Sequence, residues 1–175
     1  MKTFVILGMH RSATSLVAKG LNNVIYLGQD DDMLPPQEDN PEGFYENNKF
    51  IDLNNEIISA AGGNWLEPPS EKAILSVKDK FTPKIKKLIS EFNDTGDYWG
   101  WKDPRTVLTI RLFHPYLINP HYIACFRQPL EVAKSLNKRN MISIQKGLRT
   151  AMEYNFRIIK FLNDKHLKID NHETK

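Results

Sequence analysis

The sequence predicts an α/β fold in which helices cover both faces of a central parallel sheet of about four to five strands. Short apolar runs rich in β-branched residues recur along the chain, and a turn and a segment of helical spacing follow each of them. Strands that alternate with helices form a parallel sheet inside a three-layer α/β/α arrangement. With 175 residues the chain is long enough for a proper core, so we expect one domain over residues 1–175.

The first unit of this pattern occupies residues 3–21, TFVILGMHRSATSLVAKGL. Residues 4–7 form the apolar run of a buried strand, Gly8 ends it, and helical spacing begins at Thr14. The turn leaves unpaired backbone N–H groups at a helix start, where the helix dipole favours an anion. Arg11 adds a guanidinium, and the hydroxyl donors are those of Ser12, Thr14 and Ser15. We therefore expect a phosphate or sulfate group here; the alternative is an ordinary capped helix with a solvated arginine.

This strand–turn–helix unit is P-loop-like but lacks two parts of the nucleoside-triphosphate loop. That loop requires G-x-x-x-x-G-K-[ST], whereas here Gly8 is followed at the right distance by Ala13 and then Thr14. The second glycine and the lysine are both missing. The sequence therefore disfavours an ATP or GTP hydrolase and a magnesium-bound triphosphate.

The remaining elements continue the alternation along the chain. Further strands are predicted at residues 24–27, 98–101 and 121–126. Helices are predicted at residues 44–61, 71–92, 106–116, 130–138 and 143–162, with Pro83 near a helix start. We expect the strands at 3–8 and 121–126 to be central, and residues 163–175 to form a polar, disordered tail.

Composition narrows the functional classes. The net charge of +3 is too small to indicate a nucleic-acid partner by itself, and no apolar stretch approaches the ~20 residues that span a bilayer. The single cysteine, Cys125, lies in an apolar run, which predicts a buried thiol in a reducing compartment. We expect a soluble cytoplasmic protein. No His, Cys and Asp cluster has ligand spacing, so no metal is predicted.

Basic side chains follow three of the predicted strands. Arg11 follows the first strand, Lys102 the third and Arg127 the fourth. Because the carboxyl ends of parallel strands meet at one edge of the sheet, these cations predict a polyanionic ligand there. Asp103 is expected to orient Lys102 or to cap the next helix, and Ser135 alone reads as an ordinary helical serine.

Four segments, in the same order, resemble sulfotransferases of the bacterial and tyrosylprotein types that use 3′-phosphoadenosine-5′-phosphosulfate. They are GMHRSATSL, NPEGFYE at residues 40–46, KDPR at residues 102–105 and FRQPLEVAKSLNKR. The first resembles the family's 5′-phosphosulfate loop. The last resembles its 3′-phosphate motif, an arginine (Arg127) with a serine (Ser135) eight residues later. The cofactor-binding residues implied by the resemblance are His10, Arg11, Ser12, Ala13, Thr14, Ser15, Arg127 and Ser135.

The resemblance also implies a reaction: transfer of a sulfuryl group to an acceptor hydroxyl or amine, with release of adenosine 3′,5′-bisphosphate. Arg11 and Lys102 would stabilise charge on the sulfuryl group and the leaving phosphate. Glu46 is the implied base, because carboxylates downstream of the loop take this role in the family. As alternatives, Glu46 simply begins a helix, and the base is His10 or one of three consecutive acids, Asp30, Asp31 and Asp32.

Two other functions remain open. Ala13 replaces the loop's usual glycine, and the chain stops at Lys175 before a further strand that family members have. These departures favour a degenerate, non-catalytic module that binds an adenosine phosphate. A third hypothesis is a nucleotide-dependent kinase, and the missing loop lysine argues against it. The sequence does not identify the acceptor substrate or the oligomeric state.

Overall fold

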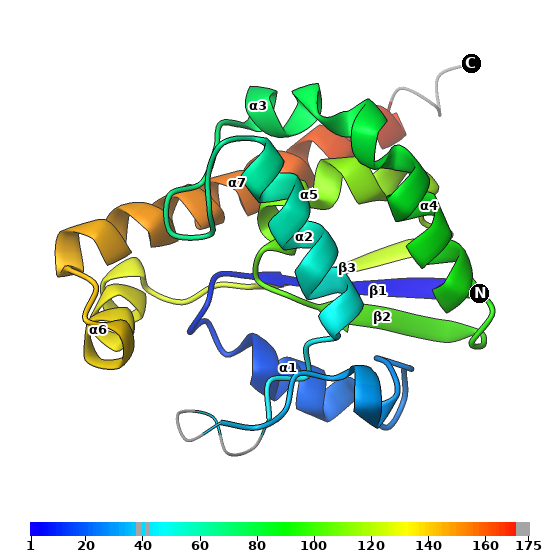
Figure 1. The fold of residues 1–175 in the computed structure, drawn as a ribbon, viewed down its shortest axis with the longest axis horizontal. Helices are drawn as coiled ribbons and strands as arrows, with labels where there is room; N and C mark the ends of the chain where they lie inside the picture. The colour runs from blue at the N-terminus through cyan, green and yellow to red at the C-terminus, as the bar shows by residue number, and fades with distance from the viewer. Residues whose placement is uncertain (38–39, 41–42, 171–175) are drawn as a thin grey trace.

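Three parallel strands form the sheet in a computed structural model that describes residues 1–37, 40 and 43–170. β1 (Lys2–Gly8) lies between β2 (Tyr98–Lys102) and β3 (Pro120–Cys125) (Figure 1). Its register pairs Val5 with Trp101 on one side and with Tyr122 on the other. Residues 5–7 are almost fully buried, because β1 is paired on both edges and covered on both faces. The predicted α/β class is confirmed.

The predicted number of strands is wrong for the described residues. Residues 24–27 contribute only an isolated parallel bridge, in which Tyr26 N donates to Tyr98 O and Gly100 N donates to Tyr26 O. Gly28, with φ of 140°, then turns the chain away before a longer ladder forms. The expectation that residues 121–126 form a central strand is also wrong. β3 pairs only with β1 and is largely half-buried, so it is an edge strand of the described sheet.

Helices cover both faces of the sheet, which gives the three layers that the sequence predicts (Figure 1). α1 (Thr14–Leu21) packs on the face to which Ile6 and Cys125 point. The opposite face carries the main core, which includes Trp99 and Trp101 and is covered by helices. These helices are α2 (Asn48–Ala60), α4 (Lys78–Asn93), α5 (Thr106–Phe113) and α7 (Ile144–Asp170). Alternate β1 side chains thus enter two separate cores.

The other elements follow the predicted order with small changes. α3 (Glu71–Ser76) precedes α4, and Pro83 lies inside α4 rather than near its start. Two 3₁₀ turns are present, η1 (Asp30–Asp32) and η2 (His114–Tyr116). α6 (Pro129–Asn140) packs against α7, which runs through residues 163–170 of the expected tail; residues 171–175 lie outside the described residues.

The structure also bears on two other predictions, the absence of a membrane span and the burial of Cys125. No helix in the described part of the chain has both the length and the apolar character needed to cross a membrane. Cys125 is buried as predicted, and its burial raises the pKa of the thiol.

Candidate functional site

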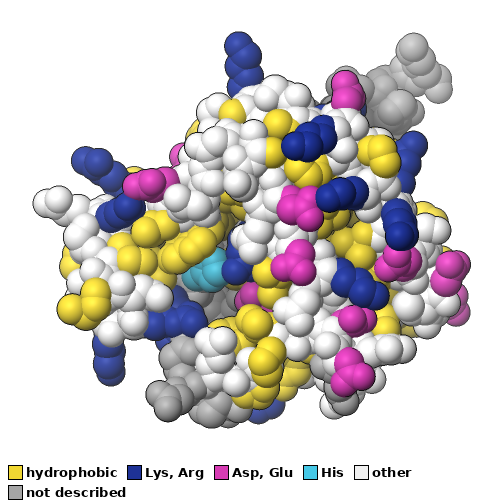
Figure 2. Space-filling model, in the orientation of Figure 1, with side chains coloured by type: hydrophobic (Ala, Val, Ile, Leu, Met, Phe, Trp, Pro, Cys, Tyr) yellow, Lys and Arg dark blue, Asp and Glu magenta, His cyan; other side chains and the backbone are white. Residues whose placement is uncertain are grey.

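A cavity of about 540 Å³ opens where the three strands end. Figure 2 shows a hollow in which a histidine lies beside basic side chains, with hydrophobic side chains around them. Eight of the predicted site residues line the cavity: His10, Arg11, Ala13, Thr14, Ser15, Glu46, Lys102 and Arg127. Residues from the ends of separate strands therefore meet at one place, as the parallel topology predicts.

The loop between β1 and α1 has a strained backbone. Arg11 and Ala13 both adopt left-handed conformations, with φ of 68° and 62°. Each such residue with a Cβ costs about 1–2 kcal/mol relative to the right-handed form. Gly8 permits the close packing of this loop, because a Cβ there would lie 2.5 Å from Thr14 Cγ2. Ser12 is buried, and its Oγ has no hydrogen-bond partner within the described residues. Such an orphaned donor is typical of a site that a ligand completes.

The loop arginine joins both parts of the predicted 3′-phosphate motif. Arg11 Nε donates to Ser135 Oγ over 2.9 Å, and Arg127 Nη1 donates to the carbonyl oxygen of Arg11 over 2.9 Å. Ser135 comes from α6 and Arg127 from the segment between β3 and α6. Ser135 does not itself line the cavity, so its observed role is to position Arg11.

Glu46 and Lys102 form a buried ion pair, with 2.5 Å between Oε1 and Nζ. Burial raises the pKa of Glu46, and nearby Asp103 raises it further, while Lys102 and Arg105 oppose the shift; the net change is upward. Glu46 does not begin a helix. Asn47 is the N-cap of α2, and its side chain accepts a hydrogen bond from Lys49 N. The capping explanation for Glu46 is therefore wrong.

Asp103 orients Arg105 rather than Lys102. Its Oδ1 accepts hydrogen bonds from Arg105 N at 3.1 Å and from Arg105 Nη1 at 2.7 Å, and its Oδ2 accepts one from Asn54 at 2.8 Å. Held in this way at the start of α5, Arg105 lines the cavity with Nη1 3.6 Å from Glu46 Oε2. The KDPR segment contains Arg105, but the sequence does not show that it contacts the predicted base.

His10 lies at the cavity wall, in surroundings that disfavour its protonated form. Burial lowers its pKa well below the usual range, and four neighbouring cations lower it further: Arg105, Lys102, Arg139 and Arg11. Its Nε2 is buried with no hydrogen-bond partner in the described part of the chain. The imidazole packs against Trp65, with 4.6 Å between ring centroids.

Asp31 and Asp32 of η1 lie away from the main cavity. Asp32 pairs with Lys49 at 3.3 Å, beside a separate cavity of about 290 Å³ that Glu91 also lines. Neither Asp31 nor Asp32 lines the main cavity, and the side chain of Asp30 lies outside the described residues. Among the side chains that the structure describes, Glu46 and His10 therefore remain as candidate bases.

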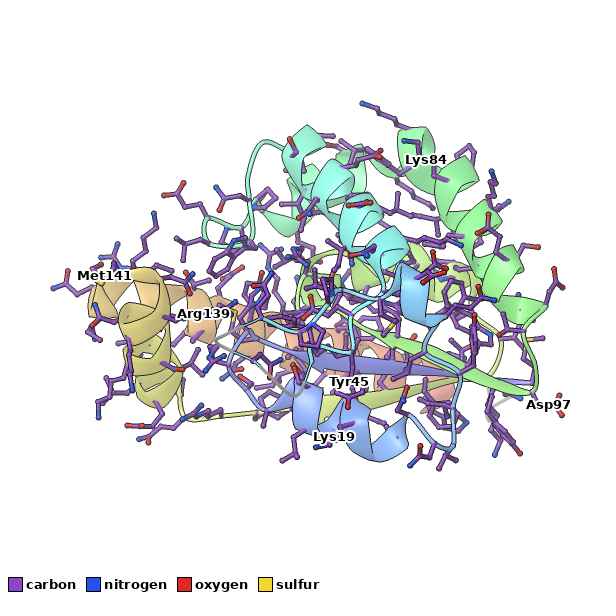
Figure 3. The ribbon with its side chains drawn as sticks, turned by 60° about the horizontal axis from the view of Figure 1, so that its bottom comes forward. Lys19, Tyr45, Lys84, Asp97, Arg139 and Met141 are labelled. Atoms are coloured by element: carbon purple, nitrogen blue, oxygen red, sulfur yellow. The ribbon has the colours of Figure 1, made fainter. Side chains whose placement is uncertain are left out.

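The sequence did not single out two other cavity residues. Arg139 lies on the side of α6 nearest the sheet, whereas Met141, just after that helix, lies at its far end (Figure 3). The guanidinium carbon of Arg139 is 5.7 Å from the centre of the Phe44 ring. Trp65 comes from the turn after α2, where no local signal indicated a site. Within the NPEGFYE segment, Asn40 and Phe44 also line the cavity, and residues 41–42 lie outside the described residues.

Comparisons of the chain with protein-family models, with curated proteins and with solved structures gave no match.

Proposed function

We propose that this chain is a sulfotransferase that moves a sulfuryl group from 3′-phosphoadenosine-5′-phosphosulfate to an acceptor hydroxyl or amine. The observation that carries the proposal is the contact of Arg11 with both Ser135 and Arg127 at the edge of one cavity. Two segments that separately resemble a phosphosulfate loop and a 3′-phosphate motif are neighbours in space, although 124 residues separate Arg11 from Ser135.

The cavity residues fit an elongated nucleotide that carries an anionic group at each end of its ribose, the 3′-phosphate and the 5′-phosphosulfate. The 5′ end would lie on the β1–α1 loop, where the backbone N–H groups of the helix start are the donors; Ser12 is buried beneath them and does not line the cavity. The 3′-phosphate would contact Arg127, which uses Nη1 on the Arg11 carbonyl and is otherwise exposed. A volume of about 540 Å³ is within the range of small-molecule sites, ~300–1,000 Å³.

The nucleotide supplies an activated sulfuryl group: its S–O bond to the phosphate breaks with the electron pair left on the phosphate oxygen, while the acceptor oxygen or nitrogen bonds to sulfur. Glu46 takes the proton that the acceptor loses. Lys102 Nζ lies 2.5 Å from Oε1, whereas Arg105 Nη1 lies farther from Oε2, at 3.6 Å, so we assign the proton to Oε2. The raised pKa of Glu46 makes it a better proton acceptor than an ordinary carboxylate. Arg11 and Lys102 place positive charge where negative charge develops.

One observation favours a non-catalytic alternative. Ala13 holds a left-handed conformation that glycine adopts without strain, and its Cβ stands on the loop that would contact the phosphosulfate. A chain in which this methyl group prevents close approach of the sulfuryl group would bind the nucleotide without transferring anything.

A thermal-shift comparison followed by a turnover assay tests the proposal. We expect adenosine 3′,5′-bisphosphate to raise the melting temperature well above the effect of ATP or of sulfate. We then expect transfer of labelled sulfate from the cofactor to a hydroxyl or amine acceptor. Firm binding of adenosine 3′,5′-bisphosphate without transfer to any acceptor would favour the binding module. Preference for ATP with magnesium would favour a kinase, and binding of neither nucleotide would refute the proposal.

A further inference from the structure

Residues 62–69, GGNWLEPP, connect α2 to α3 and are called here the Trp65 loop. Three side chains on one face of α7 donate hydrogen bonds to backbone carbonyls of this loop. Thr150 Oγ1 donates to Leu66 O at 2.9 Å and Tyr154 OH donates to Trp65 O at 3.0 Å. Arg157 Nη2 donates to the carbonyl of Pro69. All three donor residues are buried, and the bond from Arg157 is itself fully buried.

The Trp65 loop is also held by its own residues. Asn64 Oδ1 accepts hydrogen bonds from the backbone N–H groups of Leu66 and Glu67, each at 2.9 Å. Gly63 has no room for a side chain, since a Cβ would lie 2.6 Å from the carbonyl oxygen of Glu67. A segment fixed by this many contacts presents its side chains in one defined position.

The side chain presented to the cavity is Trp65. One part of the indole packs on the main core, and another part lines the cavity beside His10. Glu46 and Lys102 line the same cavity. The cavity therefore combines a carboxylate for proton removal with a flat, apolar indole and a neutral imidazole.

We propose that Trp65 forms the acceptor-binding wall of the cavity, and that the acceptor is a hydroxyl compound whose ring has an apolar face, such as a phenol or a pyranose sugar. This inference rests on the sulfotransferase function proposed above. Aromatic rings and the C–H face of a pyranose both bury apolar area against an indole, so they share the required chemistry. The Trp65 wall is distinct from the residues assigned to the nucleotide phosphates, which are those of the β1–α1 loop and Arg127.

The charge of the cavity favours hydroxyl over amine acceptors. Among the described residues, one carboxylate, that of Glu46, lines the cavity, and the lining cations are Arg11, Lys102, Arg105, Arg127 and Arg139. A protonated amine would be repelled by this excess of positive charge, whereas a neutral hydroxyl would not. Of the two acceptor classes in the proposed function, we therefore expect hydroxyl compounds rather than amines.

Equilibrium binding, measured by ligand-observed NMR, tests the wall separately from catalysis. The probes are phenol, methyl glucopyranoside and a ring-free alcohol, propanol, each with and without adenosine 3′,5′-bisphosphate. We expect Trp65→Ala to weaken binding of the ring that the parent prefers by ~10-fold, and Trp65→Phe to restore most of it. Propanol binding and nucleotide affinity should not change. Phe156→Ala is the control, because Phe156 is an aromatic on α7 that is 61% exposed and does not line the cavity.

Tyr154→Phe tests the positioning of the wall. It removes the hydroxyl that holds Trp65 O and keeps the buried ring. We expect a higher KM for the ring acceptor at unchanged nucleotide affinity.

The outcomes separate the two proposals. Ring binding by Trp65→Ala at the parent's affinity, or a parent that binds neither ring, would overturn the wall. Ring binding that depends on Trp65, in a protein that neither binds adenosine 3′,5′-bisphosphate nor transfers sulfate, would support the wall and refute the sulfotransferase function. The probe that the parent protein binds more tightly, phenol or methyl glucopyranoside, shows whether the acceptor is an aromatic or a sugar hydroxyl compound.

Discussion

Glu46 and Lys102, 56 residues apart in the chain, form an ion pair whose side chains are only 5% and 2% exposed. Two charges removed from water stabilise each other, and the loss of Lys102 would leave the buried Glu46 facing the more distant Arg105, whose Nη1 is 3.6 Å from Oε2. Asp103 and Arg105 form a second pair beside them, with 2.7 Å between Oδ1 and Nη1. The candidate catalytic centre is therefore also a part of the molecule on which folding stability depends.

Lys102→Met is expected to lower the free energy of unfolding by ~3–5 kcal/mol at neutral pH, because it leaves Glu46 as a buried carboxylate. Removing Lys102 also raises the folded-state pKa of Glu46 further. A carboxyl whose folded pKa lies above its unfolded value loses stability as pH rises through that window, so the defect should be smaller near pH 4.5. Urea denaturation at both pH values measures this. Lys84→Met is the control, since Lys84 forms an exposed pair with Glu56. Equal losses in the two variants would contradict the prediction.

Glu46→Gln is expected to reduce kcat by ~10²-fold or more while keeping nucleotide affinity, because the amide preserves shape and cannot take the acceptor's proton. Steady-state kinetics with labelled cofactor and calorimetry with adenosine 3′,5′-bisphosphate are the measurements. Asp32→Asn, at an acid away from the cavity, should leave kcat unchanged. Normal turnover by an active Glu46→Gln enzyme would move the base to His10.

Arg127→Ala is expected to weaken binding of adenosine 3′,5′-bisphosphate by tenfold or more, ~1.5–3 kcal/mol for a charge-assisted contact. Ser135→Ala should do less, because it removes a neutral hydroxyl that acts through Arg11. Lys134→Ala, which removes a cation from α6 outside the cavity, is the matched control. Isothermal calorimetry at fixed salt is the measurement. An Arg127→Ala variant with the parent's affinity would show that the 3′-phosphate assignment is wrong.

Ala13→Gly is expected to stabilise the fold by ~1 kcal/mol, because the residue is held at φ 62° and glycine lacks the Cβ that makes this conformation costly. Ala18→Gly provides the contrast. Ala18 is buried inside α1, where loss of the methyl group should destabilise by ~1 kcal/mol or more. Thermal unfolding measures the change in stability of both variants, which we expect to be positive for Ala13→Gly and negative for Ala18→Gly. A destabilised Ala13→Gly protein would mean that the alanine methyl makes a contact worth more than the backbone strain.

His10→Gln is expected to make the free energy of unfolding less dependent on pH, so that it decreases less than in the parent as the pH is lowered. Burial and the surrounding cations lower the pKa of His10 in the folded state. The unfolded chain therefore binds more protons, and the stability present above about pH 6.5 is lost as pH falls toward the folded pKa. Urea midpoints between pH 7.5 and 5 measure this loss. His121→Gln, at an exposed histidine stacked on Phe4, is the control. The same pH slope in His10→Gln and the parent would contradict the prediction.

Local pattern in the sequence was sufficient for the fold class and for most of the elements. The apolar run before Gly8 and the helical spacing after Thr14 predict β1 and α1, because burial on both faces selects apolar residues without regard to what covers them. Residues 24–27 carry the same local signal as a strand, yet they form one bridge. A segment becomes a strand only where a partner strand lies beside it for several residues. Here the chain turns away at Gly28, and the local sequence pattern does not predict this turn.

The sequence by itself determined which residues could reach the edge of the sheet: the parallel order brings Arg11, Lys102 and Arg127 to the carboxyl ends of their strands. Only the tertiary structure decided their partners. Ser135 binds Arg11, and Lys102 pairs with Glu46. The physical reason is that periodicity encodes which face of an element is buried, whereas these contacts across 124 and 56 residues depend on how elements pack. Trp65 shows this best, because a turn with no periodic signal is placed at the cavity by buried donors on α7.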